Sequence, residues 1–120
     1  MNTVFLDYAT LGPADLDSAA MLEQLPGIQL FDYTDETELP GRIADAEIIM
    51  VNKISLDARL LASAANLKLV CLAATGSDNV DLEAATELGI AVCNIRDYCT
   101  PSVVQHVFAL IPVSYTHLRA

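Results

Sequence analysis

The chain has 120 residues, 53% of them hydrophobic, and a formal net charge of −10 at pH 7. This length is enough for one domain with a hydrophobic core and too short for two. The acidic charge and the lack of a basic cluster argue against nucleic-acid binding, because phosphate backbones would be repelled. No signal peptide or membrane-spanning run is visible, so we expect a cytoplasmic protein without a membrane partner.

Apolar runs rich in β-branched residues recur along the chain and predict five strands. They cover residues 3–6, 28–33, 48–51, 69–73 and 91–94. Their near-continuous apolar character is typical of strands that are covered on both faces of a parallel sheet.

Helical patterns separate these strands. The predicted helices cover residues 15–24, 55–64 and 82–88, with a weaker turn at 40–44 and a last helix from 100 onward. Ser55 and Asp81 are the expected N-caps of the second and third helices, and Gly89 fits the left-handed residue that ends the third. Thr100 and Pro101 are typical of a helix start, whereas Pro112 should break or end that last helix.

The strands and helices alternate from the beginning of the chain to its end. Such alternation predicts an α/β fold with a doubly wound parallel sheet and right-handed crossovers. Five strands favour the flavodoxin-like order 2-1-3-4-5.

In sheets of this kind, ligands bind where the strands end at their carboxyl edge. Asn52 and Lys53 follow the third predicted strand, and Thr75 and Gly76 follow the fourth. Lys53 could neutralise an anionic ligand, and backbone amides around Gly76 could hold a carboxylate. Each also has a plainer interpretation: Lys53 as a solvated charge, Asn52 as closing its own turn, and Gly76 as part of an ordinary turn.

Other candidate residues are less informative. Cys71, Cys93 and Cys99 are odd in number and lack paired spacing, which argues against a disulfide framework or a zinc site and favours free thiols. His106 lies within the last predicted helix without a nearby nucleophile, so we interpret it as structural. No glycine-rich phosphate-binding motif or nucleophile motif is present.

Two segments resemble the D-isomer-specific 2-hydroxyacid dehydrogenases. The first runs LKLVCLAATGSDNVDLEAA from residue 67 and continues as ELGIAVCN to residue 94. The second is YCTPSVVQHVFAL at residues 98–110. The opening LDYATLGP and the VNK turn at 51–53 are similar to the glycerate dehydrogenase and hydroxypyruvate reductase branch of that family.

This resemblance implies an NAD-dependent or NADP-dependent oxidoreductase that interconverts a 2-keto acid and a D-2-hydroxy acid. It implies that the backbone around Thr75 and Gly76 holds the substrate carboxylate, with Asn52 and Lys53 on the rim of the same cleft. The substrate-side set would also include the hinge residue Tyr98. The two residues on the nicotinamide side would be Thr100 and Val103.

The resemblance also implies a division of the chain. Residues 1–99 would form the N-terminal substrate domain, and 100–111 the start of an interdomain crossover helix. Residues 112–120 have no apolar period, so we expect, independently of the resemblance, a non-native tail, with a genuine ragged C-terminus as the alternative. The family's catalytic Arg, Glu and His and its cofactor fingerprint would lie outside this sequence. We therefore expect a piece of a homodimeric enzyme that is inactive alone.

A flavodoxin-like regulatory or ligand-binding module without catalysis is the alternative. A phosphorylation receiver would need an aspartate after the third strand to accept the phosphate. Val51, Asn52 and Lys53 stand there instead, so the receiver interpretation lacks its nucleophile.

Overall fold

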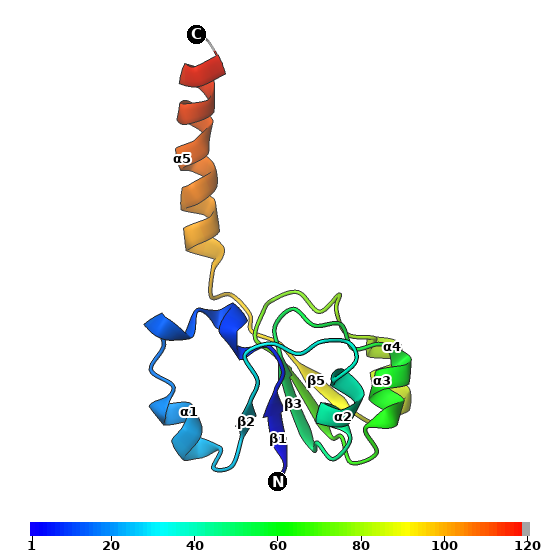
Figure 1. Ribbon diagram of the computed structural model, residues 1–120. Coiled ribbons are helices and arrows are strands. Elements are labelled where there is room, and N and C mark those ends of the chain that lie inside the picture. Colours follow the sequence, from blue (N-terminus) through cyan, green and yellow to red (C-terminus); the bar gives the residue numbers. More distant parts are fainter. Residues whose placement is uncertain (119–120) are drawn as a thin grey trace.

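The computed structural model describes residues 1–118, which form a five-stranded parallel sheet flanked by short helices and followed by one long helix (Figure 1). The strands are β1 (Thr3–Phe5), β2 (Gln29–Leu30), β3 (Ile48–Val51), β4 (Leu69–Leu72) and β5 (Ala91–Cys93). All neighbouring pairs are parallel and the order is β2-β1-β3-β4-β5. The predicted doubly wound topology is therefore confirmed.

Two 3-10 turns and five α-helices connect or follow the strands. They are η1 (Tyr8–Leu11), η2 (Pro13–Asp15), α1 (Ala19–Gln24), α2 (Leu39–Ile43), α3 (Ala58–Ser63), α4 (Leu82–Glu87) and α5 (Thr100–Leu118). The first helix is shorter than predicted, because Leu16 is extended and interrupts the chain between η2 and α1. Strand β2 is also short, since the carbonyls of Phe31 and Asp32 leave the ladder and accept from Tyr8 N and Ala9 N at 2.9 and 3.2 Å.

The helix caps agree with the sequence at one helix and differ at another. Asp81 caps α4 as expected, accepting from Ala84 N at 3.0 Å, and Gly89 follows with a φ of +70°. Ser55 was the wrong cap for α3. Asp57, in an extended conformation, accepts from Leu60 N at 2.8 Å, while Leu56 between them is buried and bridges to Val80.

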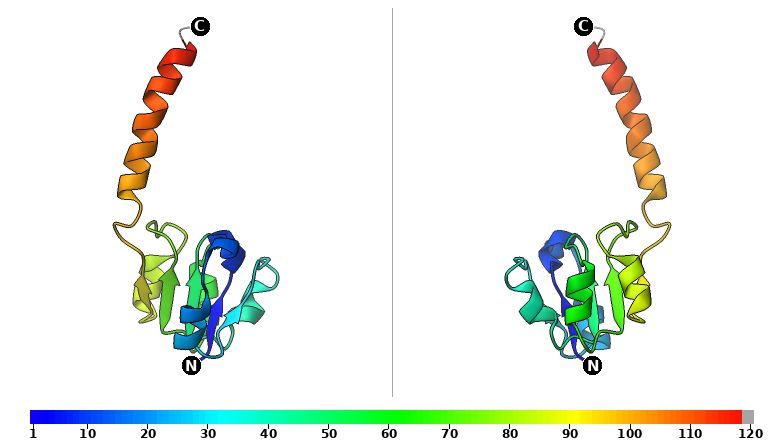
Figure 2. Two further views of the ribbon diagram at one scale, coloured as in Figure 1. Left: turned by 90° about the vertical axis from the view of Figure 1, so that its left-hand side faces the viewer. Right: turned by 90° about the vertical axis from the view of Figure 1, so that its right-hand side faces the viewer.

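The prediction that Pro112 ends the last helix was wrong. Pro112 lies inside α5, which runs on to Leu118. Proline removes one backbone N–H and its ring crowds the carbonyl four residues earlier, but this 19-residue helix continues on both sides of it. Figures 1 and 2 show α5 pointing away from the α/β body. Its apolar side chains are accordingly exposed, with Val103 at 54% and Phe108 at 68%.

The two faces of the sheet are covered unequally. Side chains such as Val4, Ile49 and Val70 are buried in a core shared with α2, α3 and α4. The alternating residues Met50 and Cys71 face the other way and are only half-buried. This face is therefore covered less completely than expected, and α1 has no buried residue.

Two absences hold for the described residues. None of their helices has both the length and the apolar character to cross a membrane. Over the same residues, no cluster of three or more His, Cys, Asp or Glu side chains is arranged to hold a metal ion.

Candidate functional site

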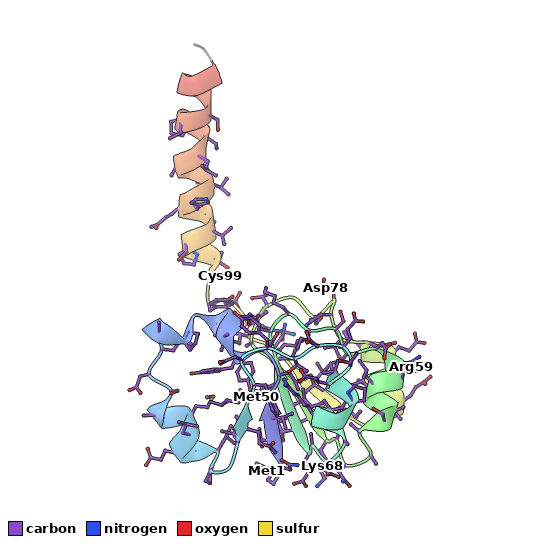
Figure 3. All side chains as sticks on the ribbon, viewed as in Figure 1. Met1, Met50, Arg59, Lys68, Asp78 and Cys99 are labelled. Carbon is purple, nitrogen blue, oxygen red and sulfur yellow. The ribbon has the colours of Figure 1, made fainter. Side chains whose placement is uncertain are left out.

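The loops that follow β1, β3, β4 and β5 meet at one end of the sheet. Figure 3 labels residues at both ends: Asp78 and Cys99 lie at the carboxyl end, and Met1 and Lys68 lie at the opposite end. This arrangement follows from the parallel topology, since every strand ends at the same edge.

A buried carboxylate organises this end of the sheet. Asp7 directly follows the buried end of the first strand and is only 2% exposed. Its Oδ1 accepts from Asn52 N at 2.9 Å, and its Oδ2 accepts from Lys53 N at 2.6 Å and Ile54 N at 3.2 Å. Three consecutive backbone amides donate to the buried carboxylate. These hydrogen bonds hold the loop after β3 against the loop after β1.

The side chains of two asparagines add further hydrogen bonds to the same loop. Asn52 is buried, and its Nδ2 donates to Thr10 Oγ1 at 2.9 Å. Asn79 Nδ2 donates to the carbonyl of Ile54 at 2.9 Å and to that of Asn52 at 3.4 Å. The side-chain amide of Asn52 therefore ties the loop after β3 to the loop after β1 rather than closing its own turn. The exposed side chain of Lys53 lies on a loop that these hydrogen bonds hold in place.

The loop after β4 is held mainly through its carbonyls. The carbonyl of Ala74 accepts from Ile95 N at 3.1 Å, and that of Thr75 accepts from Asn94 Nδ2 at 2.6 Å. Among the residues that the structure describes, the backbone N–H groups of 74–77 donate to no protein acceptor. A run of unpaired amides at the end of a strand is a binding feature for a carboxylate or phosphate.

Gly76 has a steric role in this loop. Its φ is not positive, so the turn does not require a left-handed residue. A Cβ at position 76 would instead lie 2.9 Å from Asp78 Oδ1. Glycine therefore leaves room for the Asp78 side chain in its present position.

Two cavities flank Lys53. The smaller has a volume of about 200 Å³ and is lined by Asn52, Lys53, Ala74, Gly76, Asp78 and Asn79. The larger has a volume of about 470 Å³ and is lined by Thr10, Leu11, Leu16, Asn52, Lys53, Ala73, Ala74, Ile95 and Tyr98. Among the residues whose side chains the structure describes, Lys53 is the one basic residue that lines either cavity, and none of those lining the larger cavity is acidic. An apolar wall with one cation suits a small organic acid.

The structure brings together most of the residues that the sequence singled out. Asn52, Lys53 and Gly76 share the smaller cavity, and Tyr98 joins Asn52 and Lys53 in the larger one. Thr75 is exposed beside them and is tied to the group by its carbonyl.

The predicted nicotinamide-side residues lie apart from the two cavities, and their role stays a prediction. Thr100 and Val103 belong to α5 and line neither cavity. Asp7 and Asn79 were not singled out as site residues. The available signal for Asp7 was an acidic residue directly after a buried strand, whereas nothing in the sequence around Asn79 indicates which carbonyls it reaches.

The fold and this site define a class: an α/β protein of flavodoxin-like topology with an anion-compatible site at the carboxyl end of its sheet. The model of the D-isomer specific 2-hydroxyacid dehydrogenase catalytic domain matches residues 8–117. The chain belongs to this family, as the sequence resemblance indicated.

Known proteins of this family are similar to the chain over most of its length. The hydroxypyruvate reductase of Blautia hydrogenotrophica is 39% identical over 114 residues, which cover 92% of this chain and 35% of that protein. The glycerate dehydrogenase of Methylorubrum extorquens is 45% identical over 74 residues, which cover 62% of this chain and 24% of that protein.

A solved structure shows the same likeness. The D-lactate dehydrogenase of Aquifex aeolicus, solved with NAD and lactic acid, superimposes with a TM-score of 0.76 at 27% identity. The match covers 92% of this chain and 32% of that one. The chain thus spans about a third of the length of this relative.

Proposed function

We propose that this chain is the substrate-binding part of an oxidoreductase that interconverts a 2-keto acid and a D-2-hydroxy acid of the hydroxypyruvate, glyoxylate or glycerate type. The observation that carries the proposal is the loop after β4, whose carbonyls are held while the N–H groups of 74–77 are unpaired. A substrate carboxylate would accept from these amides, and the ammonium group of Lys53 would balance its charge.

The chain matches only part of each relative, which suggests that substrate binding and cofactor binding lie in different parts of a longer enzyme. The relatives are about three to four times longer than the aligned segments, at 35% and 24% coverage. We propose that residues 1–99 bind the substrate and that 100–111 begin a crossover toward a separate part of a longer, dimeric, cytoplasmic enzyme. That part would bind NAD, or NADP, and supply the hydride chemistry.

The cofactor-side residues are proposed on the family resemblance alone. Thr100 and Val103 lie at the beginning of α5, where the chain leaves the body. When bound, NAD would supply the hydride, and this chain's part would be to hold the acid in place with Lys53 and the amides of 74–77. Substrate bound at a fixed site reacts faster because the entropy of positioning has already been lost.

A chimera tests the proposal. Residues 1–111 would replace the aligned N-terminal segment of the Blautia hydroxypyruvate reductase, which is similar over 114 residues. We expect NADH oxidation that depends on hydroxypyruvate or glyoxylate. The variant Lys53→Met should raise KM about tenfold, because one charge-assisted contact with a carboxylate is lost.

Lys68→Met is the matched control. Lys68 lies at the opposite end of the sheet and is paired with Glu47 at 2.7 Å, so its loss should leave KM unchanged. A folded chimera that consumes no NADH with any 2-keto acid would contradict the proposal, as would equal effects of the two lysine substitutions.

A further inference from the structure

Two of the three cysteines lie side by side on neighbouring strands, although 22 residues separate them in the chain. Cys71 on β4 and Cys93 on β5 are direct partners in the parallel register. Cys93 Sγ donates to Cys71 Sγ at 3.5 Å. Both are free thiols.

We propose that Cys71 and Cys93 form a reversible intramolecular disulfide and are a thiol-modification site of this protein. Neighbouring strands lie about 4.8 Å apart, which falls within the Cα–Cα range that a disulfide spans. The two sulfur atoms have only to approach from van der Waals contact to bonding distance, so side-chain rotation can close the gap. The pair is independent of the carboxylate site.

The two thiols differ in their exposure to solvent, and this difference determines which of them reacts first with an oxidant. Cys93 lies on the edge strand β5 and is exposed, whereas Cys71 is half-buried on β4. Cys93 therefore meets a soluble oxidant first. The reaction needs an external low-molecular-weight disulfide, for which oxidised glutathione is the chemical class.

The chemistry balances in two exchanges. The Cys93 thiolate attacks one sulfur of oxidised glutathione, breaking its S–S bond and releasing one glutathione thiolate. The Cys71 thiolate then attacks Cys93 Sγ in the mixed disulfide, forming the Cys71–Cys93 bond and releasing the second glutathione thiolate. Two protein thiols are oxidised, one glutathione disulfide is reduced, and the protons leave to solvent or to the released thiolates.

The surroundings of Cys71 favour this order. Burial first, and then the hydrogen bond and charge of Cys93, raise the pKa of the Cys71 thiol to about 12. Once Cys93 is bonded to glutathione it carries no charge. The pKa of Cys71 then falls, because burial alone continues to raise it, and the resolving thiolate becomes easier to form.

The test uses the whole chain with the substitution Cys99→Ser, which removes the third thiol. The protein is treated with oxidised glutathione under native conditions, alkylated and digested with trypsin. Lys68 and Arg96 bracket a tryptic peptide, 69–96, that contains both cysteines. We expect this peptide to lose two hydrogen atoms, to resist alkylation and to recover its original mass after reduction.

Two variants and denaturation in urea test whether the crosslink depends on the folded arrangement of the two thiols or only on the reactivity of each thiol. Cys71→Ser should accumulate a stable glutathione adduct on Cys93, because the resolving thiol is gone. Cys93→Ser should react at Cys71 at least about tenfold more slowly than Cys93 does in the converse variant, because Cys71 is half-buried. In denaturing urea the crosslink should form more slowly, since the strands no longer hold the thiols together.

Three results would overturn the proposal. The first is stable glutathionylation of the wild-type pair without a crosslink. The second is crosslinking that is as fast in urea as in the native protein. The third is a disulfide-linked dimer as the main product of the Cys99→Ser chain, seen by non-reducing electrophoresis. Each is measured on protein that still contains both cysteines, so a variant that fails to fold does not affect the outcome.

Discussion

The two ends of the sheet use lysine in opposite ways. At the amino end, Lys68 Nζ lies 2.7 Å from Glu47 Oε1, and the same glutamate accepts from Asn2 N at 3.0 Å. At the carboxyl end, Lys53 makes no ion pair within the described part of the chain, and unpaired amides at 74–77 lie in the adjoining loop. Lys68, which is already paired with Glu47, therefore has a structural role. Lys53 and the amides of 74–77 have no such partner and are available to a ligand.

The buried support beneath the carboxyl end differs just as clearly from the exposed pairs at the amino end. Asp7 is 2% exposed and accepts three backbone N–H bonds, whereas Lys68 is an exposed surface residue. Exposed ion pairs contribute little to stability, while a buried, hydrogen-bonded carboxylate is costly to remove. The carboxyl end should therefore be the more sensitive of the two to substitution.

The largest effect is expected for Asp7→Ala. The substitution leaves the N–H groups of Asn52, Lys53 and Ile54 without their acceptor in a largely buried place. We expect the free energy of unfolding to fall by about 3 kcal/mol. Urea denaturation followed by circular dichroism measures it.

Asp45→Ala is the control for this substitution, because Asp45 is exposed and its carboxylate accepts no hydrogen bond from the residues that the structure describes. It should change the free energy of unfolding by less than about 0.5 kcal/mol. If the two aspartate variants were equally stable, Asp7 would not be the anchor of the loop after β3.

A smaller effect is expected for Asn79→Ala, which removes the side-chain donor to the carbonyls of Ile54 and Asn52. The lost bonds join uncharged groups, which contribute less than bonds to a buried carboxylate. We expect a loss of about 1 kcal/mol in the free energy of unfolding, measured in the same way.

Asn66→Ala provides the matched comparison, since Asn66 is exposed and lies outside the site. An unchanged stability for Asn79→Ala would mean that the loop carrying Lys53 is held by Asp7 alone.

The smallest effect belongs to the amino end. The hydrogen bond from Lys68 first, then that from Asn2, holds the pKa of Glu47 below its ordinary value of 4.5. Because the pKa is lowered in the folded state, the stabilising contribution is present above pH 4.5 and is lost as the pH falls through the lowered value. Lys68→Met should move the pKa of Glu47 back toward 4.5.

Carboxyl-carbon NMR titration of the two lysine variants measures this shift. Lys53→Met should leave the pKa of Glu47 where it is, because Lys53 lies at the other end of the sheet. If the pKa of Glu47 were the same with and without Lys68, the claim that Lys68 is engaged by Glu47 while Lys53 is free for a ligand would fail.

The sequence predicted the parts of this molecule that depend on short-range pattern. Alternating strands and helices were enough for the order β2-β1-β3-β4-β5, and Asp81 and Gly89 marked the ends of α4 correctly. Asn52, Lys53 and Gly76 could be placed together because parallel strands end at a common edge.

Features that depend on long-range contacts were not predictable in this way. Asp57 caps α3 in place of Ser55 because the bridge between Leu56 and Val80 fixes where that helix starts. The adjacency of Cys71 and Cys93 depends on the register of two strands, which chain spacing does not reveal. The continuation of α5 through Pro112 likewise depends on the summed stability of the whole helix and not on one residue.

The most direct test of the central claim is amide NMR of the isotopically labelled chain during titration with hydroxypyruvate, with the neutral dihydroxyacetone as the control ligand. The account predicts that the acid alone shifts the backbone N–H signals of 74–77 and that Lys53→Met weakens this response, while Lys68→Met does not. Shifts that are equal for the acid and the neutral compound, or that gather around Glu47 and Lys68, would contradict it.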